Sequence, residues 1–148
     1  LSMKIIYYGP NKKKLNYKYF KNLKDMASLI DVMVVTCIGG KETKDLINKS
    51  ILKLMKPSSI IINVSRGSVI NEVHLLDALN KNLIGGAALD VFEMEPKINN
   101  KFLKLKNVLL SPHNGSATFE TREKMANISS QNLLNLLYLN KIRNKVRY

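Results

Sequence analysis

Five short apolar runs, separated by segments with helical spacing, constrain this sequence more than any other feature. They lie at residues 4–8, 32–36, 59–64, 86–91 and 107–111 and are rich in β-branched side chains. Short continuous apolar runs are typical of strands that are covered on both faces of a parallel sheet. The runs therefore predict five buried strands.

Three segments predict helices, at residues 23–30, 72–80 and 117–139, and a fourth, at residues 44–55, predicts one or two turns followed by a helix. In segment 72–80, Val73, Leu76 and Leu79 recur every three residues, with Leu75 beside them, which favours one apolar stripe. In segment 117–139, apolar side chains recur at helical spacing at positions 125, 128, 133, 136 and 137. Strands that alternate with helices predict an α/β domain with a doubly wound parallel sheet of the Rossmann type.

In such sheets, ligands bind outside the carboxyl ends of the strands. Three of the predicted strand ends carry an ionisable side chain, namely Arg66, Glu95 and His113. A guanidinium matches a carboxylate in bidentate geometry, an imidazole exchanges a proton near neutral pH, and a carboxylate beside the imidazole favours its charged form. Reduction of a 2-keto acid needs these three functions. Taken singly, each residue also fits a plain surface, loop or turn role.

Composition excludes several other classes. The 148 residues suit one domain, and no apolar run approaches the roughly 18 residues of a membrane span. The net charge is +13, but lysines are spread along the chain without a nucleic-acid-binding signature, so we expect neither a nucleic-acid nor a membrane partner. We see no secretory signal, and the single cysteine, Cys37, suits a reducing cytoplasm.

Three motifs resemble one family, the D-isomer-specific 2-hydroxyacid dehydrogenases. They are Ile62-Asn63-Val64-Ser65-Arg66-Gly67-Ser68-Val69-Ile70-Asn71-Glu72, then Ala88-Leu89-Asp90-Val91-Phe92-Glu93-Met94-Glu95-Pro96, then Ser111-Pro112-His113-Asn114-Gly115-Ser116-Ala117-Thr118. The resemblance runs from about Met3 to the C-terminus, and the motifs follow in the family's order. It implies hydride transfer between a nicotinamide cofactor and a small 2-keto or 2-hydroxy acid, at a site without a metal.

The resemblance also implies a role for individual residues. Arg66 would bind the substrate carboxylate and carbonyl, His113 would be the acid-base residue, and Glu95 would orient and polarise His113. Asp90 would hydrogen-bond the nicotinamide carboxamide. Further cofactor-binding positions implied in this way are Thr36, Cys37, Ile38, Val64, Ser65 and Gly115.

The residues after the first predicted strand bear on the choice of cofactor. An acidic residue at this strand end accepts from the ribose 2′-hydroxyl of NAD and repels a 2′-phosphate. Here Gly9 stands in that place, followed by Asn11, Lys12 and Lys13. The loss of the carboxylate and the gain of cations favour NADP, with NAD as the alternative cofactor. The pattern resembles the glyoxylate/hydroxypyruvate reductase branch of the family. A plainer interpretation is that these lysines are only solvated.

The sequence contains no G-x-G-x-x-G turn, which in this family follows a first strand and holds the pyrophosphate at a helix N-terminus. We therefore expect residues 1–148 to be a partial NAD(P)-binding domain without that strand and loop, with the substrate domain largely absent. Such a chain alone should be marginally stable, bind dinucleotide weakly and be catalytically silent.

Other functions stay open. One alternative is a non-catalytic dinucleotide-binding or interaction fragment, because fold alone does not fix function. Another is a phosphoglycerate or D-lactate dehydrogenase, since these enzymes resemble the same family. Family members are commonly dimers, which makes a homodimer the candidate assembly.

Overall fold

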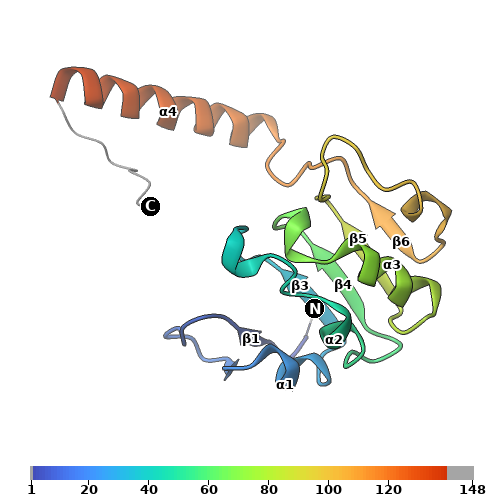
Figure 1. Cartoon of the computed structure of the whole chain (residues 1–148). Helices are drawn as coiled ribbons and strands as arrows, with labels where there is room; N and C mark the ends of the chain where they lie inside the picture. Colours follow the sequence, from blue (N-terminus) through green and yellow to red (C-terminus); the bar gives the residue numbers. More distant parts are fainter. Residues whose placement is uncertain (1, 140–148) are drawn as a thin grey trace. The chain divides into compact units, whose positions relative to one another are not determined.

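The structure is a computed structural model that describes residues 2–139 (Figure 1). It consists of two units, Leu1–Pro112 and His113–Tyr148, which are treated separately below. Among residues 2–139, the strands lie in the first unit, and the second unit holds one long helix.

A four-stranded parallel sheet forms the centre of the first unit. Its strands are β3 (Val32–Val35), β4 (Ile60–Asn63), β5 (Gly86–Leu89) and β6 (Val108–Leu110), in that order across the sheet. All four lie within the predicted strand segments. The α/β class with a parallel sheet is therefore confirmed.

A separate parallel pair is formed by β1 (Ile6–Tyr8) and β2 (Lys18–Phe20). The sequence predicted β1 but not β2, which has three residues and begins with an exposed lysine. In the usual doubly wound sheet, a further strand lies between the two strands to which β1 and β3 correspond. Among the described residues β1 and β3 share no ladder, so the sheet is divided at that place.

One face of the four-stranded sheet carries the core. Met33, Val35 and Ile61 are buried in a single cluster with side chains of α1 (Leu23–Ala27), α2 (Lys49–Leu52) and α3 (Glu72–Asn80). On the other face, Val32 and Val34 are 37% and 55% exposed. The prediction that both faces of the strands are covered is therefore wrong for this part of the sheet in the first unit.

The helices of this unit begin at asparagine caps. Asn22, Asn48 and Asn71 accept backbone N–H groups of the first turns of α1, α2 and α3. The helix α3 has the predicted bounds, whereas α2 covers only the middle of the predicted segment 44–55, after a 3₁₀ turn at Lys41–Thr43. Two more 3₁₀ turns lie at Gly67–Val69 and Phe102–Lys104.

The predicted stripe of α3 is wrong at its first position. Leu75, Leu76 and Leu79 are buried, but Val73 is 71% exposed. A spacing of three residues moves a side chain about 60° round the helix at each step, so the first position drifts off the buried face.

Outside the core, the pKa of Asp77 is lowered by the hydrogen bond that it accepts from Lys81 Nζ at 2.6 Å.

The second unit consists of α4 (Phe119–Leu139) and the segment that leads into it. Thr118 caps the helix, because its Oγ1 accepts from the Thr121 N–H at 3.2 Å. No residue of α4 is buried. None of the helices among residues 2–139 is both long and apolar enough to cross a bilayer.

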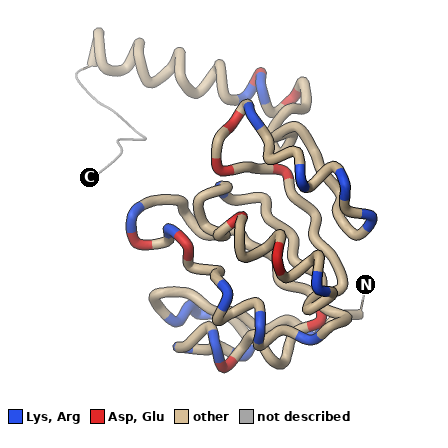
Figure 2. The backbone as a smooth tube through the Cα atoms, turned by 45° about the vertical axis from the view of Figure 1, so that its right-hand side comes forward, with Lys and Arg blue, Asp and Glu red and all other residues tan. Residues whose placement is uncertain are grey.

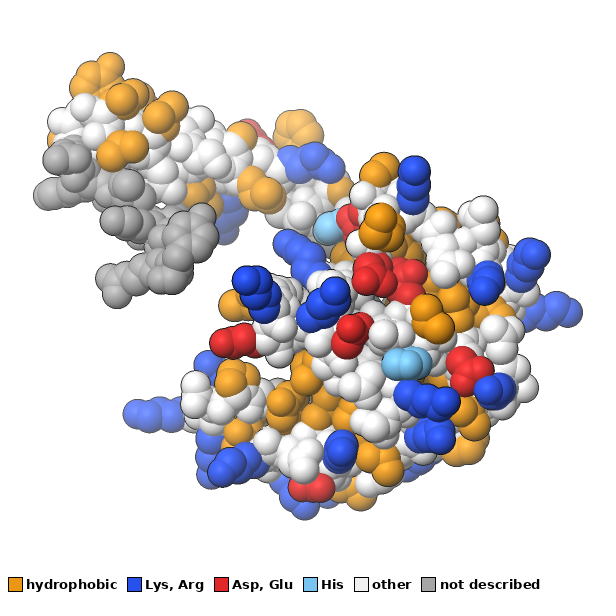
Figure 3. All heavy atoms as spheres, in the orientation of Figure 1, with side chains coloured by type: hydrophobic (Ala, Val, Ile, Leu, Met, Phe, Trp, Pro, Cys, Tyr) orange, Lys and Arg blue, Asp and Glu red, His pale blue; other side chains and the backbone are white. Residues whose placement is uncertain are grey.

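Lysine and arginine occur in every part of the first unit, between acidic residues (Figure 2). The space-filling view shows them spread over the visible face instead of gathered in one stripe (Figure 3). The distribution matches lysines on solvated surfaces.

Candidate functional site

The carboxyl ends of the four central strands lie level with one another. The last residues of the strands, Val35, Asn63, Leu89 and Leu110, are register partners across the sheet. The ladder continues for one more residue, because the N–H groups of residues 64, 90 and 111 donate to the carbonyls of residues 35, 63 and 89 at 3.3, 3.0 and 2.9 Å. The loops after these strands therefore start from one edge, and all the predicted site residues from Thr36 to Asp90 lie on them.

Asn63 organises the loop after β4. Its side chain is 1% exposed, its Nδ2 donates to the carbonyl of Arg66, and its Oδ1 accepts from the N–H of Ser65, both at 3.0 Å. A buried amide is tolerated when its donor and acceptor are both satisfied. The arrangement folds residues 63–66 into a tight turn that presents Arg66 at the surface.

The loop after β3 adjoins this turn. The Ser65 hydroxyl donates to the carbonyl of Cys37. The stem of Arg66 lies against Gly39, where a Cβ would come within 2.5 Å of Arg66 Cγ, and Arg66 Nη1 donates to the carbonyl of Ser65 at 2.7 Å. Gly39 thus allows the close approach of the Arg66 stem to the loop after β3.

The side chains at this edge suit a flat, partly apolar ligand. Ile38 is 89% exposed and Val64 49% exposed, whereas Ser65 is buried and Cys37 half-buried. Thr36 is exposed beside them. Exposed apolar side chains next to a hydroxyl and backbone amides provide contacts for an aromatic ring and its polar substituents.

The loop after β5 contacts the loop after β4 at Gly67. A Cβ at this glycine would overlap the backbone of Phe92 and Glu93, so only glycine allows the two segments to pack. The structure therefore brings together the loops that carry Arg66 and Glu95.

Within this loop, the Glu95 carboxylate bonds to the backbone three residues earlier. Its Oε1 accepts from the N–H of Phe92 at 2.9 Å, and the bond between Glu95 and Pro96 is cis. The next backbone amide donates to a second carboxylate: the N–H of Glu93 donates to Glu72 Oε1 at 2.8 Å. Asp90, half-buried at the start of the loop, continues the ladder to β4.

His113 belongs to the second unit and follows the end of β6 by three residues. Its φ is +56°, a left-handed conformation that non-glycine residues adopt rarely and often at functional positions. The next residues form a turn in which the N–H of Ala117 donates to the carbonyl of Asn114 at 3.0 Å, and Gly115 lies exposed within it. The meeting of His113 with Arg66 and Glu95 stays a prediction.

The loop after β1 is held by two tyrosines. The Tyr19 hydroxyl donates to the carbonyl of Gly9 at 2.9 Å, and the Tyr7 hydroxyl accepts from the N–H of Lys13 at 2.8 Å. These bonds curl the loop back on its strand. Asn11 and Lys12 lie exposed on the loop between these two attachment points.

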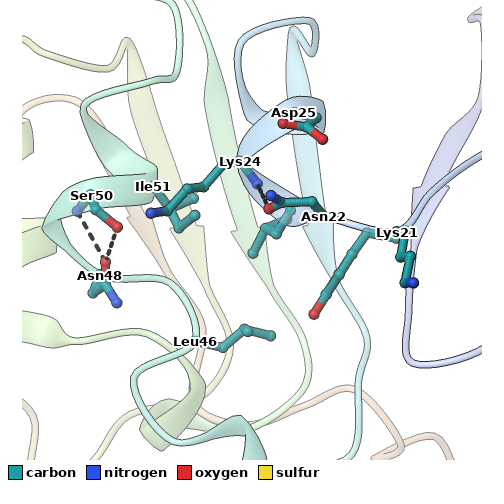
Figure 4. Close-up of a pocket in the computed structure, with 10 residues that line it drawn as sticks. Lys21, Asn22, Lys24, Asp25, Leu46, Asn48, Ser50 and Ile51 are labelled. Carbon is teal, nitrogen blue, oxygen red and sulfur yellow. Dashed lines mark hydrogen bonds between the residues drawn. The ribbon is translucent and has the colours of Figure 1, made fainter.

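A hollow of about 630 Å³ opens between α1 and the segment that leads into α2 (Figure 4). Its polar side chains are largely in local use, since Asn22 accepts from the N–H of Lys24 and Asn48 from the N–H and hydroxyl of Ser50. None of the predicted site residues lines it. The hollow is therefore separate from the loops described above.

Sequence reasoning assigned no role to several residues that build the site. Asn63 and Glu72 both lie in the first motif. Asn63 is a polar residue at the end of an apolar strand, which is itself a signal. Gly67, in the same motif, signals a close approach of two backbones. Tyr7 and Tyr19 gave no signal, because their bonds depend on the pairing of β1 with β2.

Comparisons with known proteins agree on one family. Residues 1–115 match the family described as D-isomer specific 2-hydroxyacid dehydrogenase, NAD binding domain. The chain is 41% identical over 137 residues to a glyoxylate reductase of Pyrococcus furiosus, covering 90% of this chain and 41% of that protein. It is also 41% identical over 130 residues to a hydroxyphenylpyruvate reductase of Plectranthus scutellarioides, covering 87% and 42%.

A solved structure resembles the chain closely as well. It is an NADPH-dependent glyoxylate/hydroxypyruvate reductase from Sinorhizobium meliloti in complex with NADP and malonate. The TM-score is 0.96 at 33% identity, over 98% of this chain and 46% of that one. The chain thus spans less than half the length of these relatives.

Proposed function

Because the chain belongs to the D-isomer specific 2-hydroxyacid dehydrogenases, in the region of their NAD-binding domain, we propose that it supplies the cofactor-binding edge and the catalytic side chains of an oxidoreductase. The reaction is hydride transfer between NADP(H) and a small 2-keto or 2-hydroxy acid such as glyoxylate or hydroxypyruvate. One observation carries the proposal: the loops after β3, β4 and β5 start level and are tied together by Ser65 and Gly67. The printed activities of the relatives support the substrate class.

The residues at the sheet edge fit the rings of a dinucleotide. Exposed Ile38 and Val64 offer apolar contacts, and Asp90 offers an acceptor for the nicotinamide carboxamide. Gly115 would let the backbone of the histidine loop approach the cofactor. The turn that binds the pyrophosphate is not among these 148 residues, as the lack of G-x-G-x-x-G indicates. When bound, the cofactor supplies the hydride.

In this proposal Arg66 binds the substrate. Its Nη1 is engaged by the carbonyl of Ser65, which fixes the plane of the guanidinium. The fork of donors then matches a carboxylate in bidentate geometry, and a donor near the carbonyl oxygen polarises that bond. Such orientation lowers the barrier because the carbonyl carbon is held within reach of the hydride.

His113 is the proposed acid. In the reduction, its imidazolium gives a proton to the carbonyl oxygen while hydride adds to the carbonyl carbon, so the product is a 2-hydroxy acid and oxidised cofactor. Glu95 is the proposed neighbour that orients the His113 ring. The N–H of Phe92 donates to Glu95 Oε1 at 2.9 Å and so restrains the direction of this carboxylate.

The loop after β1 supports NADP as the cofactor. Gly9 has no carboxylate to repel a 2′-phosphate, and Lys12 and Asn11 are exposed beside it. The tethers from Tyr7 and Tyr19 limit the loop's freedom, which lowers the entropic cost of binding a phosphate there.

The proposal includes a cytoplasmic homodimer. Cys37 carries a free thiol, which supports a reducing compartment. Light scattering of the protein expressed from its complete reading frame tests the assembly, and a monomeric mass would count against it.

Steady-state oxidation of NADPH by the same protein, with glyoxylate and hydroxypyruvate, tests the function. His113→Ala should lower kcat by about 10²–10⁴-fold, the usual contribution of a general acid, in a variant that circular dichroism shows to be folded. Arg66→Lys should raise the KM for the keto acid roughly tenfold, since a lysine offers no bidentate fork. A folded wild-type protein that reduces no 2-keto acid would contradict the proposal.

A further inference from the structure

Glu72 makes a contact that its place in a helix does not require. It is the first residue of α3, and the helix is already capped by Asn71, whose Oδ1 accepts from the N–H of His74 at 3.0 Å. The Glu72 carboxylate instead reaches a segment 21 residues further along the chain, where its Oε1 accepts from the N–H of Glu93 at 2.8 Å. The contact therefore joins the start of α3 to the loop after β5.

The segment that Glu72 reaches carries two successive amides bound to carboxylates. The N–H of Phe92 donates to Glu95, and the N–H of Glu93 donates to Glu72. The same backbone packs against Gly67 without room for a Cβ. Gly67 and Glu72, which lie on one segment, therefore both contact the start of the loop that carries Glu95.

We propose that Glu72 is a positioning residue for Glu95. The inference rests on the proposed function, in which Glu95 stands behind the acid-base histidine. By holding the N–H of Glu93, Glu72 fixes the turn in which Glu95 Oε1 accepts from Phe92, and so sets the direction of the Glu95 carboxylate. Because Glu72 and Arg66 lie on the same segment, the contact also sets the substrate-binding loop against the Glu95 loop.

A plainer role for Glu72 predicts a different result. An acidic residue in the first turn of a helix interacts favourably with the helix dipole through its charge. The Glu72→Gln variant loses that charge but keeps a side-chain oxygen that accepts from Glu93, whereas Glu72→Ala loses both. Positioning therefore predicts that glutamine substitutes for glutamate, and the dipole role predicts that it does not. Asp25→Ala, which removes the acid in the first turn of α1, is the matched control.

The first arm of the test is amide hydrogen exchange of the 148-residue chain, measured by NMR. Protection of the Glu93 amide should fall at least roughly tenfold in Glu72→Ala and stay within about threefold of wild type in Glu72→Gln and in Asp25→Ala, since one hydrogen bond to a charged group is at stake. Unchanged protection in Glu72→Ala would overturn the inference, as would an equal loss in Glu72→Gln.

The second arm measures NADPH-linked glyoxylate reduction by the protein from its complete reading frame. We expect kcat to fall roughly tenfold in Glu72→Ala, with the KM for glyoxylate little changed, and to recover in Glu72→Gln. The isotope effect with 4-deuterated NADPH should rise in the alanine variant, because hydride transfer then limits turnover more strongly. This ratio does not depend on the fraction of folded enzyme. A wild-type protein without activity would refute the proposed function alone, whereas an active alanine variant with unchanged kcat would overturn the role of Glu72.

Discussion

Replacing Asn63 by alanine tests how the loop after β4 is built. The change removes the acceptor of the Ser65 N–H and the donor to the Arg66 carbonyl. Ser65 is only 6% exposed, so its amide loses a partner that water cannot easily replace, which costs about 1–3 kcal/mol. The Arg66 carbonyl keeps the N–H of Val69 as a donor at 3.2 Å, so that loss is nearer about 1 kcal/mol.

The expected total is a loss of about 2–4 kcal/mol in the free energy of unfolding, a large share of the stability of a small domain. Urea unfolding of the 148-residue chain, followed by circular dichroism, measures it. Asn80→Ala is the matched control, because Asn80 is exposed and its Nδ2 donates only to the carbonyl of Leu76, one turn back in α3. We expect the control to stay within about 0.5 kcal/mol of wild type. If both variants lost the same free energy, Asn63 would not organise the loop.

Three further outcomes are expected. Lys12→Glu should lower the preference for NADPH over NADH roughly tenfold, because a phosphate contact becomes a repulsion, and an unchanged ratio of kcat/KM values would show that Lys12 is only solvated. Gly67→Ala should destabilise the chain by about 1–3 kcal/mol in the same urea assay, since its Cβ overlaps the backbone of Phe92; a neutral effect would deny the close approach. Amides of β1 should exchange with solvent roughly tenfold faster than those of β4, because an isolated strand pair is marginal; equal rates would show one cooperative sheet.

Much of the fold could be predicted from local sequence. The strands of the central sheet are short apolar runs, and α3 carries apolar side chains at helical spacing, so its bounds were predicted correctly. The strand β2 was missed because Lys18–Phe20 is short, half-exposed and paired only with β1. Segment 44–55 was predicted to hold one or two turns and a helix, and the helix there is short, Lys49–Leu52, after an isolated bridge from Ile47 to Ile70.

The site was predictable in part. Arg66, Glu95 and His113 follow strand ends, and parallel strands in level register place their loops at one edge, as the structure of the first unit shows for Arg66 and Glu95. The contacts that hold these loops could not be predicted from local sequence, because Glu72 meets Glu93 and Gly67 meets Phe92 only after the chain has folded. The residue types that make these contacts stand in the first motif, but the residues that they contact cannot be read from it.

The central claim is that this edge carries out hydride transfer to a 2-keto acid. The most direct measurement incubates the protein from its complete reading frame with glyoxylate and NADPH deuterated at C4 on the transferred face, and observes the product by NMR. We predict deuterium at C2 of the glycolate, and its loss when His113 is replaced by alanine. A folded protein that binds NADPH but yields no deuterated glycolate, or other 2-hydroxy acid from hydroxypyruvate, would contradict the account.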